Sequence, residues 1–212
     1  MAALPHRGIA QARKERSLSP VIPVLWLGLA LWGAVAMMSF SSRPGSAGAP
    51  PAKWPMESSL ASPAEKPALL MFVHPYCGCC QASLSELATL MKDCQGRVNA
   101  RVLFFRSGGQ PTNWVKSDLW RRASQIPGVS VASDLNGRQA RLFGVETSGE
   151  VILYGEDGRL RFQGGVTLSR GHLGENPGRA ALTALISHKP SHVTQTPVFG
   201  CPIFGEQLTA QR

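Results

Sequence analysis

Residues 68–80 of this chain read ALLMFVHPYCGCC. The first six are all apolar, which is typical of a strand buried on both faces of a sheet. His74, Pro75 and Tyr76 then lead into three cysteines. From Ser83 the apolar residues follow helical spacing, and Gly96 ends that pattern. We therefore expect the cysteines to lie at the junction between a buried strand and a helix.

Beyond this junction the sequence alternates between strand and helix patterns. Strands are predicted at 98–105 and 129–132, with a hairpin over 151–162. Helices are predicted at 113–124, at 138–143, and from Asn176 or Pro177 to about His188. This order predicts an α/β fold, a mixed sheet flanked by helices on both faces. Residues 189–212 form a tail without a clear element.

An uncharged stretch, VIPVLWLGLALWGAVAMMSF, runs from Val21 to Phe40. A helix of about 20 residues spans the roughly 30 Å hydrocarbon core of a bilayer. Basic residues precede it, so the positive-inside rule predicts a cytoplasmic segment over 1–20 and a single-pass transmembrane anchor over 21–40. The C-terminal domain would then lie outside a bacterial cytoplasmic membrane, in the periplasm. The alternative, a cleaved signal peptide, exports the domain as well.

Residues 41–67 are rich in proline, serine, alanine and glycine and show no apolar periodicity. This composition predicts a flexible linker between the anchor and a domain over 68–188. Part of the net charge of +9 lies in the N-terminal 20 residues. From residue 41 on the charges are scattered, without basic runs or interleaved aromatic residues, so nucleic acid is not an expected partner. The sequence also lacks a phosphate-binding loop, a dinucleotide fingerprint and a Ser-His-Asp triad.

The cysteines carry the most specific chemical signal. Cys77 and Cys80 form a C-x-x-C pair, and Cys77 and Cys79 form a C-x-C pair. Free N–H groups and the dipole at a helix start stabilise a thiolate, so Cys77 is the expected nucleophile in either register. Cys79 or Cys80 would then resolve a mixed disulfide. A strained Cys79–Cys80 disulfide and a purely structural disulfide are the remaining alternatives.

With these residues the chain resembles the thioredoxin-like superfamily. Tyr76 stands where those proteins carry an aromatic residue before the first cysteine, and 144–162 is similar to the second half of their fold. The blocks 74–79, 82–87, 169–176 and 198–202 resemble RedB-type membrane-anchored bacterial thioredoxin-like proteins. That resemblance implies a C-x-C pair, with Cys80 as an addition.

The chain departs from the superfamily in one loop. Thioredoxins place a cis-proline beside the dithiol, whereas this loop reads Glu146-Thr147-Ser148-Gly149. The proline shapes the substrate-binding backbone in the superfamily. Its replacement by Thr147 and Ser148 weakens the expectation of broad disulfide exchange and leaves room for metal binding at the thiols.

Five further residues either assist the site or have only a structural role. His74 is either a metal ligand that also tunes the thiolate or a polar residue at the end of the strand. Arg170 and His172 lie on a polar loop that either lines the site or merely connects elements. Cys201 either joins the cluster, as a disulfide partner or metal ligand, or stays free. Cys94 is expected in the core.

Two functions compete. The first is a thiol–disulfide oxidoreductase that needs no cofactor and acts on a protein disulfide or dithiol. The alternative is a copper-binding or copper-delivery module, with Cys77, Cys79, Cys80 and His74 as ligands, because thiolates suit soft ions such as Cu(I). A peroxide-reducing enzyme is disfavoured, because residues 73–76 lack the hydroxyl group that such sites place before the reactive cysteine.

Overall fold

The computed structural model describes residues 21–204 and divides into two units, the first ending at Met38 and the second beginning at Ser39. The expected basic segment 1–20 and the end of the tail, 205–212, lie outside the described residues. Helix α1 (Val21–Ser42) has a mean hydropathy of 2.1 in its most apolar window. By length and composition it can cross a membrane, which fits the predicted anchor.

The second unit is built on one five-stranded sheet. Its strands are β1 (Ala68–Val73), β2 (Asn99–Arg106), β3 (Val129–Leu135), β4 (Glu150–Tyr154) and β5 (Leu160–Gly164), in the order β3-β2-β1-β4-β5. β2 is parallel to β1 and β3, whereas β4 is antiparallel to β1 and β5. Every residue of the central strand β1 is buried, as its apolar run predicted.

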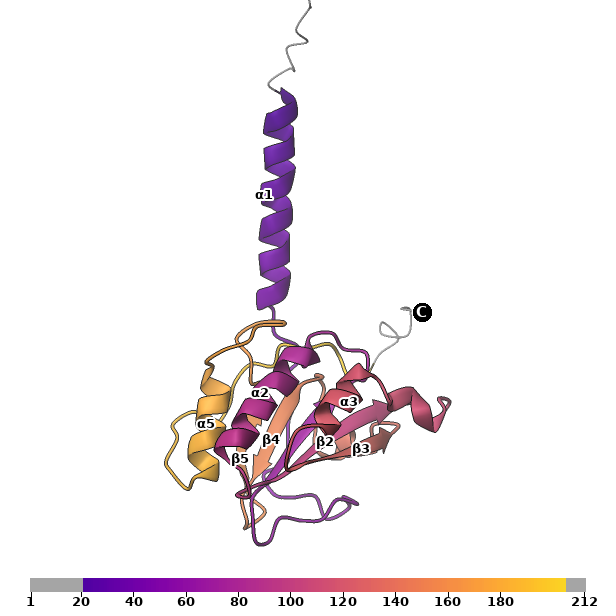
Figure 1. Ribbon diagram of the computed structural model, residues 1–212, viewed down its shortest axis with the longest axis vertical. Coiled ribbons are helices and arrows are strands. Elements are labelled where there is room, and N and C mark those ends of the chain that lie inside the picture. The colour runs from indigo at the N-terminus through magenta and orange to yellow at the C-terminus, as the bar shows by residue number, and fades with distance from the viewer. Residues whose placement is uncertain (1–20, 205–212) are drawn as a thin grey trace, which may run out of the picture. The chain divides into compact units, whose positions relative to one another are not determined.

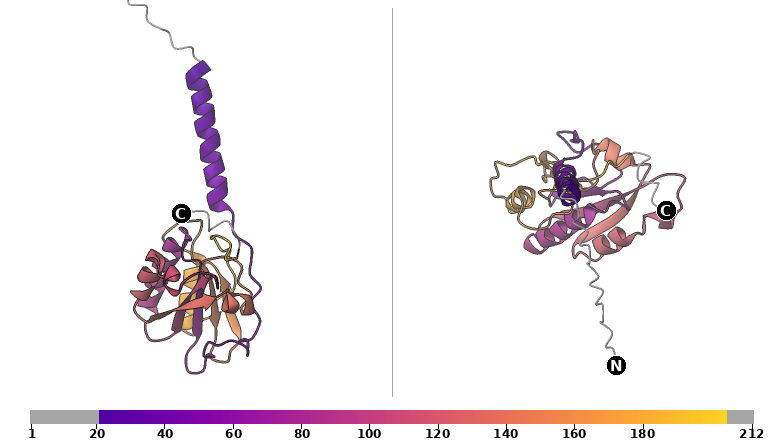
Figure 2. Two further views of the ribbon diagram at one scale, coloured as in Figure 1. Left: turned by 90° about the vertical axis from the view of Figure 1, so that its right-hand side faces the viewer. Right: turned by 90° about the horizontal axis from the view of Figure 1, so that it is seen from above.

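Helices cover both faces of this sheet. Residues of α2 (Cys80–Asp93), α3 (Asp118–Ser124) and α5 (Pro177–Ile186) pack on one face; in Figure 1, α2 and α3 lie in front of the strands and α5 to their left. α4 (Arg138–Leu142) packs on the other, on the opposite side of the sheet from α2 and α3 in the view from above (Figure 2). The expected mixed α/β sheet flanked by helices is therefore confirmed.

Two helix boundaries differ from the sequence prediction. The single helix expected over 113–124 is split into a 3₁₀ turn, η1 (Thr112–Val115), and α3. The Ser117 side chain accepts a hydrogen bond from Trp120 N and caps α3, so the helix starts anew there. α2 begins at Cys80 rather than Ser83. Its first turn therefore includes a cysteine.

The segment expected to be a flexible linker instead lies along the domain. Gly45 N donates to Val198 O and Ala49 N to Gly144 O, each at 2.8 Å. The Trp54 ring meets two buried aromatic rings edge-on, Phe143 at 4.9 Å and Tyr154 at 5.3 Å between centroids. The composition of the segment does not predict this packing, because one tryptophan and a few backbone hydrogen bonds are enough to hold the segment on the domain.

We expect Trp54→Ala to lower the free energy of unfolding of the domain by about 2 kcal/mol, since a half-buried aromatic side chain is removed. Denaturant unfolding of the full-length protein in detergent measures this. Met56→Ala is the matched control, because Met56 lies in the same segment and is 95% exposed. Equal stability of the two variants would contradict the packing role of Trp54.

Candidate functional site

The thiols lie where β1 gives way to α2. Cys77 N donates to His74 O and Cys80 N donates to Cys77 O, both at 3.0 Å, so the chain turns tightly here. Cys79 is the cap residue of α2 and Cys80 its first residue. Cys77 and Cys80 are fully buried, whereas Cys79 is partly exposed. The site thus has one side open to solvent.

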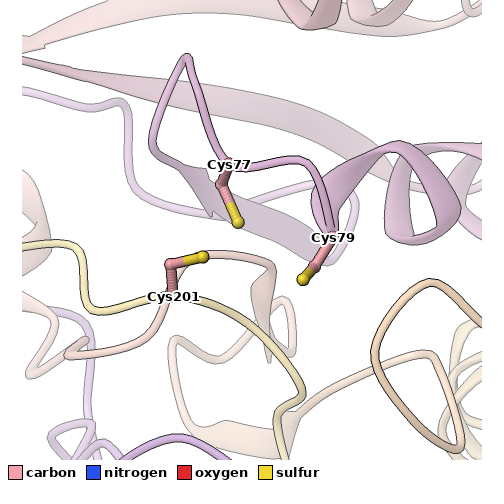
Figure 3. A group of neighbouring side chains, drawn as sticks. All are labelled: Cys77, Cys79 and Cys201. Atoms are coloured by element: carbon pink, nitrogen blue, oxygen red, sulfur yellow. The ribbon is translucent and has the colours of Figure 1, made fainter. Parts of the chain in front are cut away.

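The tail adds a fourth cysteine to this junction. The sulfur atoms of Cys77, Cys79 and Cys201 all lie within 4.8 Å of one another, and Figure 3 shows them turned toward a common centre. All five cysteines of the chain lie in the described residues, and all are free thiols. We call Cys77, Cys79, Cys80 and Cys201 the four-thiol site.

Cys77 is the electrostatic centre of the four-thiol site. Hydrogen bonds from the thiols of Cys201, Cys79 and Cys80 strongly lower the pKa of Cys77, and they outweigh its burial, which acts in the opposite direction. The same bonds raise the pKa values of Cys80 and Cys201, because these thiols must keep their protons to donate. Cys77 is therefore the residue held as a thiolate.

The loop 146–149, which lacks the cis-proline, places a hydroxyl group beside the thiols. The Ser148 Oγ accepts a hydrogen bond from His74 N at 2.7 Å and lies 3.0 Å from Cys80 Sγ. Its neighbour Thr147 is buried and donates its hydroxyl proton to Ser46 O at 2.8 Å, on the segment along the domain. Ser148 therefore contacts the thiols. Thr147 instead binds residues 41–67, which lie along the domain and which we call the covering segment.

Ser148→Ala is expected to lower the free energy of unfolding by about 1–3 kcal/mol, because the buried His74 N–H loses its acceptor. Thermal unfolding of the reduced protein measures the effect. Ser85→Ala is the control, since Ser85 is exposed and only bonds the carbonyl of Gln81 one turn earlier. If the two serine variants melt alike, the Ser148 hydrogen bond does not stabilise the junction.

The ring of His74, a metal ligand in the copper alternative predicted from the sequence, packs among aromatic side chains. Its ring is buried, stacks on Phe105 at 5.8 Å, and uses Nδ1 to accept from Tyr76 N at 3.3 Å. Burial lowers its pKa despite the nearby Cys77. Among the described residues the group that can hold a metal contains Cys201 instead of His74 and Cys80. The loop brings His74 inward against aromatic side chains, which the sequence does not reveal.

Tyr76 and the polar loop complete the surroundings. The Tyr76 ring is 46% exposed, and its hydroxyl donates to Trp114 O at 3.0 Å. Arg170 Nη1 lies 4.0 Å from Cys79 Sγ and donates to Gly200 O at 2.5 Å, so this cation borders the thiols. His172 is exposed, and in the described part of the chain its side chain forms no hydrogen bond with the thiols.

Two of the buried carboxylates, those of Glu86 and Glu150, were not predicted from the sequence. Glu86, on the inner face of α2, accepts from Gly174 N at 2.8 Å and pairs with Arg179 at 3.1 Å, which ties down the loop that carries Arg170. Glu150, at the start of β4, is 1% exposed. A charged residue within the apolar stripe of α2 was the available signal for Glu86.

Glu150 is an unusual group for a strand. Its Oε2 has no hydrogen-bond partner in the described part of the chain. Burial raises its pKa to about 7, although the backbone amides of Glu146 and Thr147 act in the opposite direction. The covering segment approaches the Glu150 carboxyl closely at Gly48, where an added Cβ would lie 2.5 Å from Glu150 Oε1. Near neutral pH this carboxyl is therefore partly protonated.

Cys94 is a core residue, as the sequence predicted, and Leu119 and two tryptophans pack with it. Cys94 and Leu119 are buried in the core beneath α2, α3 and α5, and Trp114 and Trp120 pack against that core. Burial raises the pKa of Cys94. This thiol is absent from the group of mutually close sulfur atoms, so it serves as a reference for the reactive ones.

Comparison with known proteins identifies the fold. No family model and no curated protein matches the sequence. Solved structures do match, among them an uncharacterized conserved protein from Geobacillus kaustophilus (18% identity, 78% of this chain and 94% of that one, TM-score 0.57) and a hypothetical protein from Sinorhizobium meliloti (20%, 77% and 96%, 0.52). A secreted disulfide oxidoreductase of Mycobacterium tuberculosis also matches (16%, 59% and 83%, 0.41). The first two likenesses and the strand order show the fold, a mixed α/β sheet flanked by helices, as the resemblance to the thioredoxin-like superfamily implied.

Proposed function

We propose that this chain is a membrane-anchored, extracytoplasmic thiol–disulfide oxidoreductase of the RedB type. The observation that carries the proposal is the gathering of Cys77, Cys79 and Cys201 at the start of α2, where hydrogen bonds from neighbouring thiols lower the pKa of Cys77. A stabilised thiolate beside potential resolving thiols is the arrangement that disulfide exchange requires.

The exchange proceeds in two balanced steps. The Cys77 thiolate attacks one sulfur of a protein disulfide, so a Cys77 mixed disulfide forms and the other substrate sulfur leaves as a thiolate. Cys79 or Cys80 then gives up its proton and attacks Cys77 Sγ, which releases the second substrate thiol. Two electrons pass to the substrate, and the reverse sequence oxidises a substrate dithiol.

The anchor sets where this exchange takes place. α1 is apolar along its whole length. The sequence before it holds the basic residues Arg7, Arg13, Lys14 and Arg16. Under the positive-inside rule the N-terminus stays in the cytoplasm and the thioredoxin-like domain reaches the periplasm. In that compartment protein disulfides and dithiols are available as partners.

A redox titration of the full-length protein in detergent tests the proposal. The protein is equilibrated in glutathione buffers of graded potential, quenched with acid, and alkylated so that each free thiol adds a mass tag. We expect two thiols, Cys77 with Cys79 or Cys80, to be lost together and regained at a single midpoint. If no reversible dithiol couple forms at Cys77, the oxidoreductase proposal is wrong.

Copper binding or delivery is the second candidate, and the convergence of three sulfur atoms within 4.8 Å favours it. Cysteine thiolates bind soft ions such as Cu(I). The donor set that fits is Cys77, Cys79 and Cys201, because these side chains point toward a common centre (Figure 3). Arg170 beside Cys79 would offset part of the negative charge of three thiolates.

Anaerobic Cu(I) titration of the reduced full-length protein against a strong chelator tests this candidate. It predicts one retained ion per chain, with Cys77, Cys79 and Cys201 protected from alkylation by copper. Cys94 is buried with or without copper, so its alkylation should not change when copper is added. His74→Ala should leave uptake unchanged, whereas Cys201→Ser should weaken it. Failure of the reduced protein to hold copper would remove the candidate.

A further inference from the structure

The tail segment 198–203 pairs with the loop that replaces the cis-proline. Ser148 N donates to Cys201 O and Ile203 N donates to Glu146 O, each at 2.8 Å. Thr147 and Pro202 form an antiparallel bridge between these hydrogen bonds. The tail segment is therefore held by main-chain pairing, the way in which an extended peptide adds to an exposed backbone edge.

The fit of the tail segment is close on both sides. A Cβ on Gly200 would lie 1.8 Å from Ser148 O, so glycine is required for this approach. Val198 and Ile203 are buried at 5% and 2% exposure, and they fix the two ends. Arg170 holds the middle by donating to Gly200 O. The pairing presents one side chain, that of Cys201, to the thiols (Figure 3).

The tail segment places the Cys201 thiol beside Cys77 (Figure 3). The Cys77 and Cys201 sulfur atoms are within 4.8 Å, and each sulfur atom can move by rotation of its side chain about the Cα–Cβ bond. A disulfide needs a sulfur–sulfur distance of about 2 Å, so a modest side-chain rotation would have to close the remaining gap.

We propose that Cys201 is a third exchange cysteine and that the tail segment is an internal stand-in for a substrate strand. The proposal rests on the oxidoreductase function proposed above. When Cys77 is in a disulfide with Cys79 or Cys80, the Cys201 sulfur loses its proton and attacks Cys77 Sγ. The Cys77–Cys201 bond forms, the first disulfide breaks, and its leaving sulfur takes up the proton. This isomerisation needs no external oxidant.

The kind of partner follows from the same contacts. A substrate that replaces the tail segment would present an extended backbone to Glu146, Thr147 and Ser148, with a cysteine at the place of Cys201. Little room exists for a side chain on the residue before that cysteine, because Gly200 meets Ser148 O directly. The partner is therefore an extended protein segment with a small residue followed by cysteine.

Disulfide mapping in the full-length protein tests the proposal. The protein is equilibrated in glutathione buffer in detergent, quenched with acid, alkylated and digested, and the linked peptides are quantified by mass spectrometry. We expect a Cys77–Cys201 linkage beside the Cys77 disulfide with Cys79 or Cys80. In Gly200→Ala the first linkage should be lost while the second remains, because the added methyl group displaces the tail segment. Cys94→Ser is the control and should change neither linkage.

The outcomes separate this proposal from the function on which it rests. A reversible Cys77 disulfide with Cys79 or Cys80, without any linkage to Cys201 in the wild-type protein, overturns the role of Cys201 and leaves the oxidoreductase standing. Absence of every Cys77 disulfide overturns both. An equal amount of the Cys77–Cys201 linkage in the wild type and in Gly200→Ala would show that tail pairing does not deliver the cysteine.

Discussion

Cys77→Ser is expected to lower the rate of thiol–disulfide exchange by at least about a thousandfold, since it removes the nucleophile itself. Cys80 and Cys201 do not replace it: the hydrogen bond to Cys77 that raises the pKa of each is lost in this variant, but burial still raises both pKa values. With Cys77 absent, these thiols lose the anion they donate to, but each remains mostly protonated near neutral pH. Reduction of a fluorescent disulfide peptide by the full-length protein measures the loss.

The matched control for this experiment is Cys94→Ser, which also replaces one buried cysteine but lies outside the four-thiol site. It should keep wild-type exchange if it folds, as circular dichroism will show. A pH titration of thiolate absorbance gives a second readout. The absorbance of one thiolate should persist into acidic solution in the wild type and vanish in Cys77→Ser. Retained exchange in Cys77→Ser would assign the nucleophile to another cysteine.

Glu150→Gln is expected to stabilise the domain by about 3 kcal/mol at pH 8, because burial raises the pKa of Glu150 from 4.5 to about 7 and one pKa unit corresponds to about 1.4 kcal/mol. In the unfolded chain the carboxyl ionises near pH 4.5, whereas in the folded protein it holds its proton to about pH 7. The folded state therefore binds more protons between these values, and its stability falls as the pH rises. Below pH 4.5 this carboxyl contributes no pH dependence, and above pH 7 the penalty is complete.

Denaturant unfolding at a series of pH values from 4 to 8 measures this effect. The stability curve of the wild-type protein should fall across the range, while that of Glu150→Gln should be flatter, so that the two separate most at the alkaline end. Glu175→Gln is the control, because Glu175 is exposed on the loop before α5. Parallel curves for wild type and Glu150→Gln would mean that the buried carboxyl does not control the pH dependence.

The thiol junction illustrates how far local sequence carries the interpretation. A short apolar run of six residues is typical of a buried strand, and the 3.6-residue spacing after it indicates a helix, so the sequence alone predicts Cys77, Cys79 and Cys80 at the junction. His74 shows where this reasoning stops. An imidazole could lower the pKa of a thiol or bind a metal, but the structure shows the His74 ring packed against the rings of Phe105 and Tyr76.

The covering segment shows a different limit. Its composition predicted a flexible linker, and composition measures only the average ability of a segment to bury apolar area. The placement of Trp54 depends on the rings of Phe143, at the end of α4, and Tyr154, in β4, which belong to a distant part of the chain. Glu150 became buried for the same reason, since the segment around Gly48 lies over it.

The sequence by itself determined the order of strands and helices, the apolar helix α1, and the position of the first three cysteines, because each depends on neighbours within one or two turns. Only the tertiary structure decided that Cys201 joins them, that Ser148 contacts Cys80, and that Arg170 borders Cys79. These contacts join segments far apart in the chain. Sheet pairing and tail pairing create them, and no local pattern encodes the distance between two such segments.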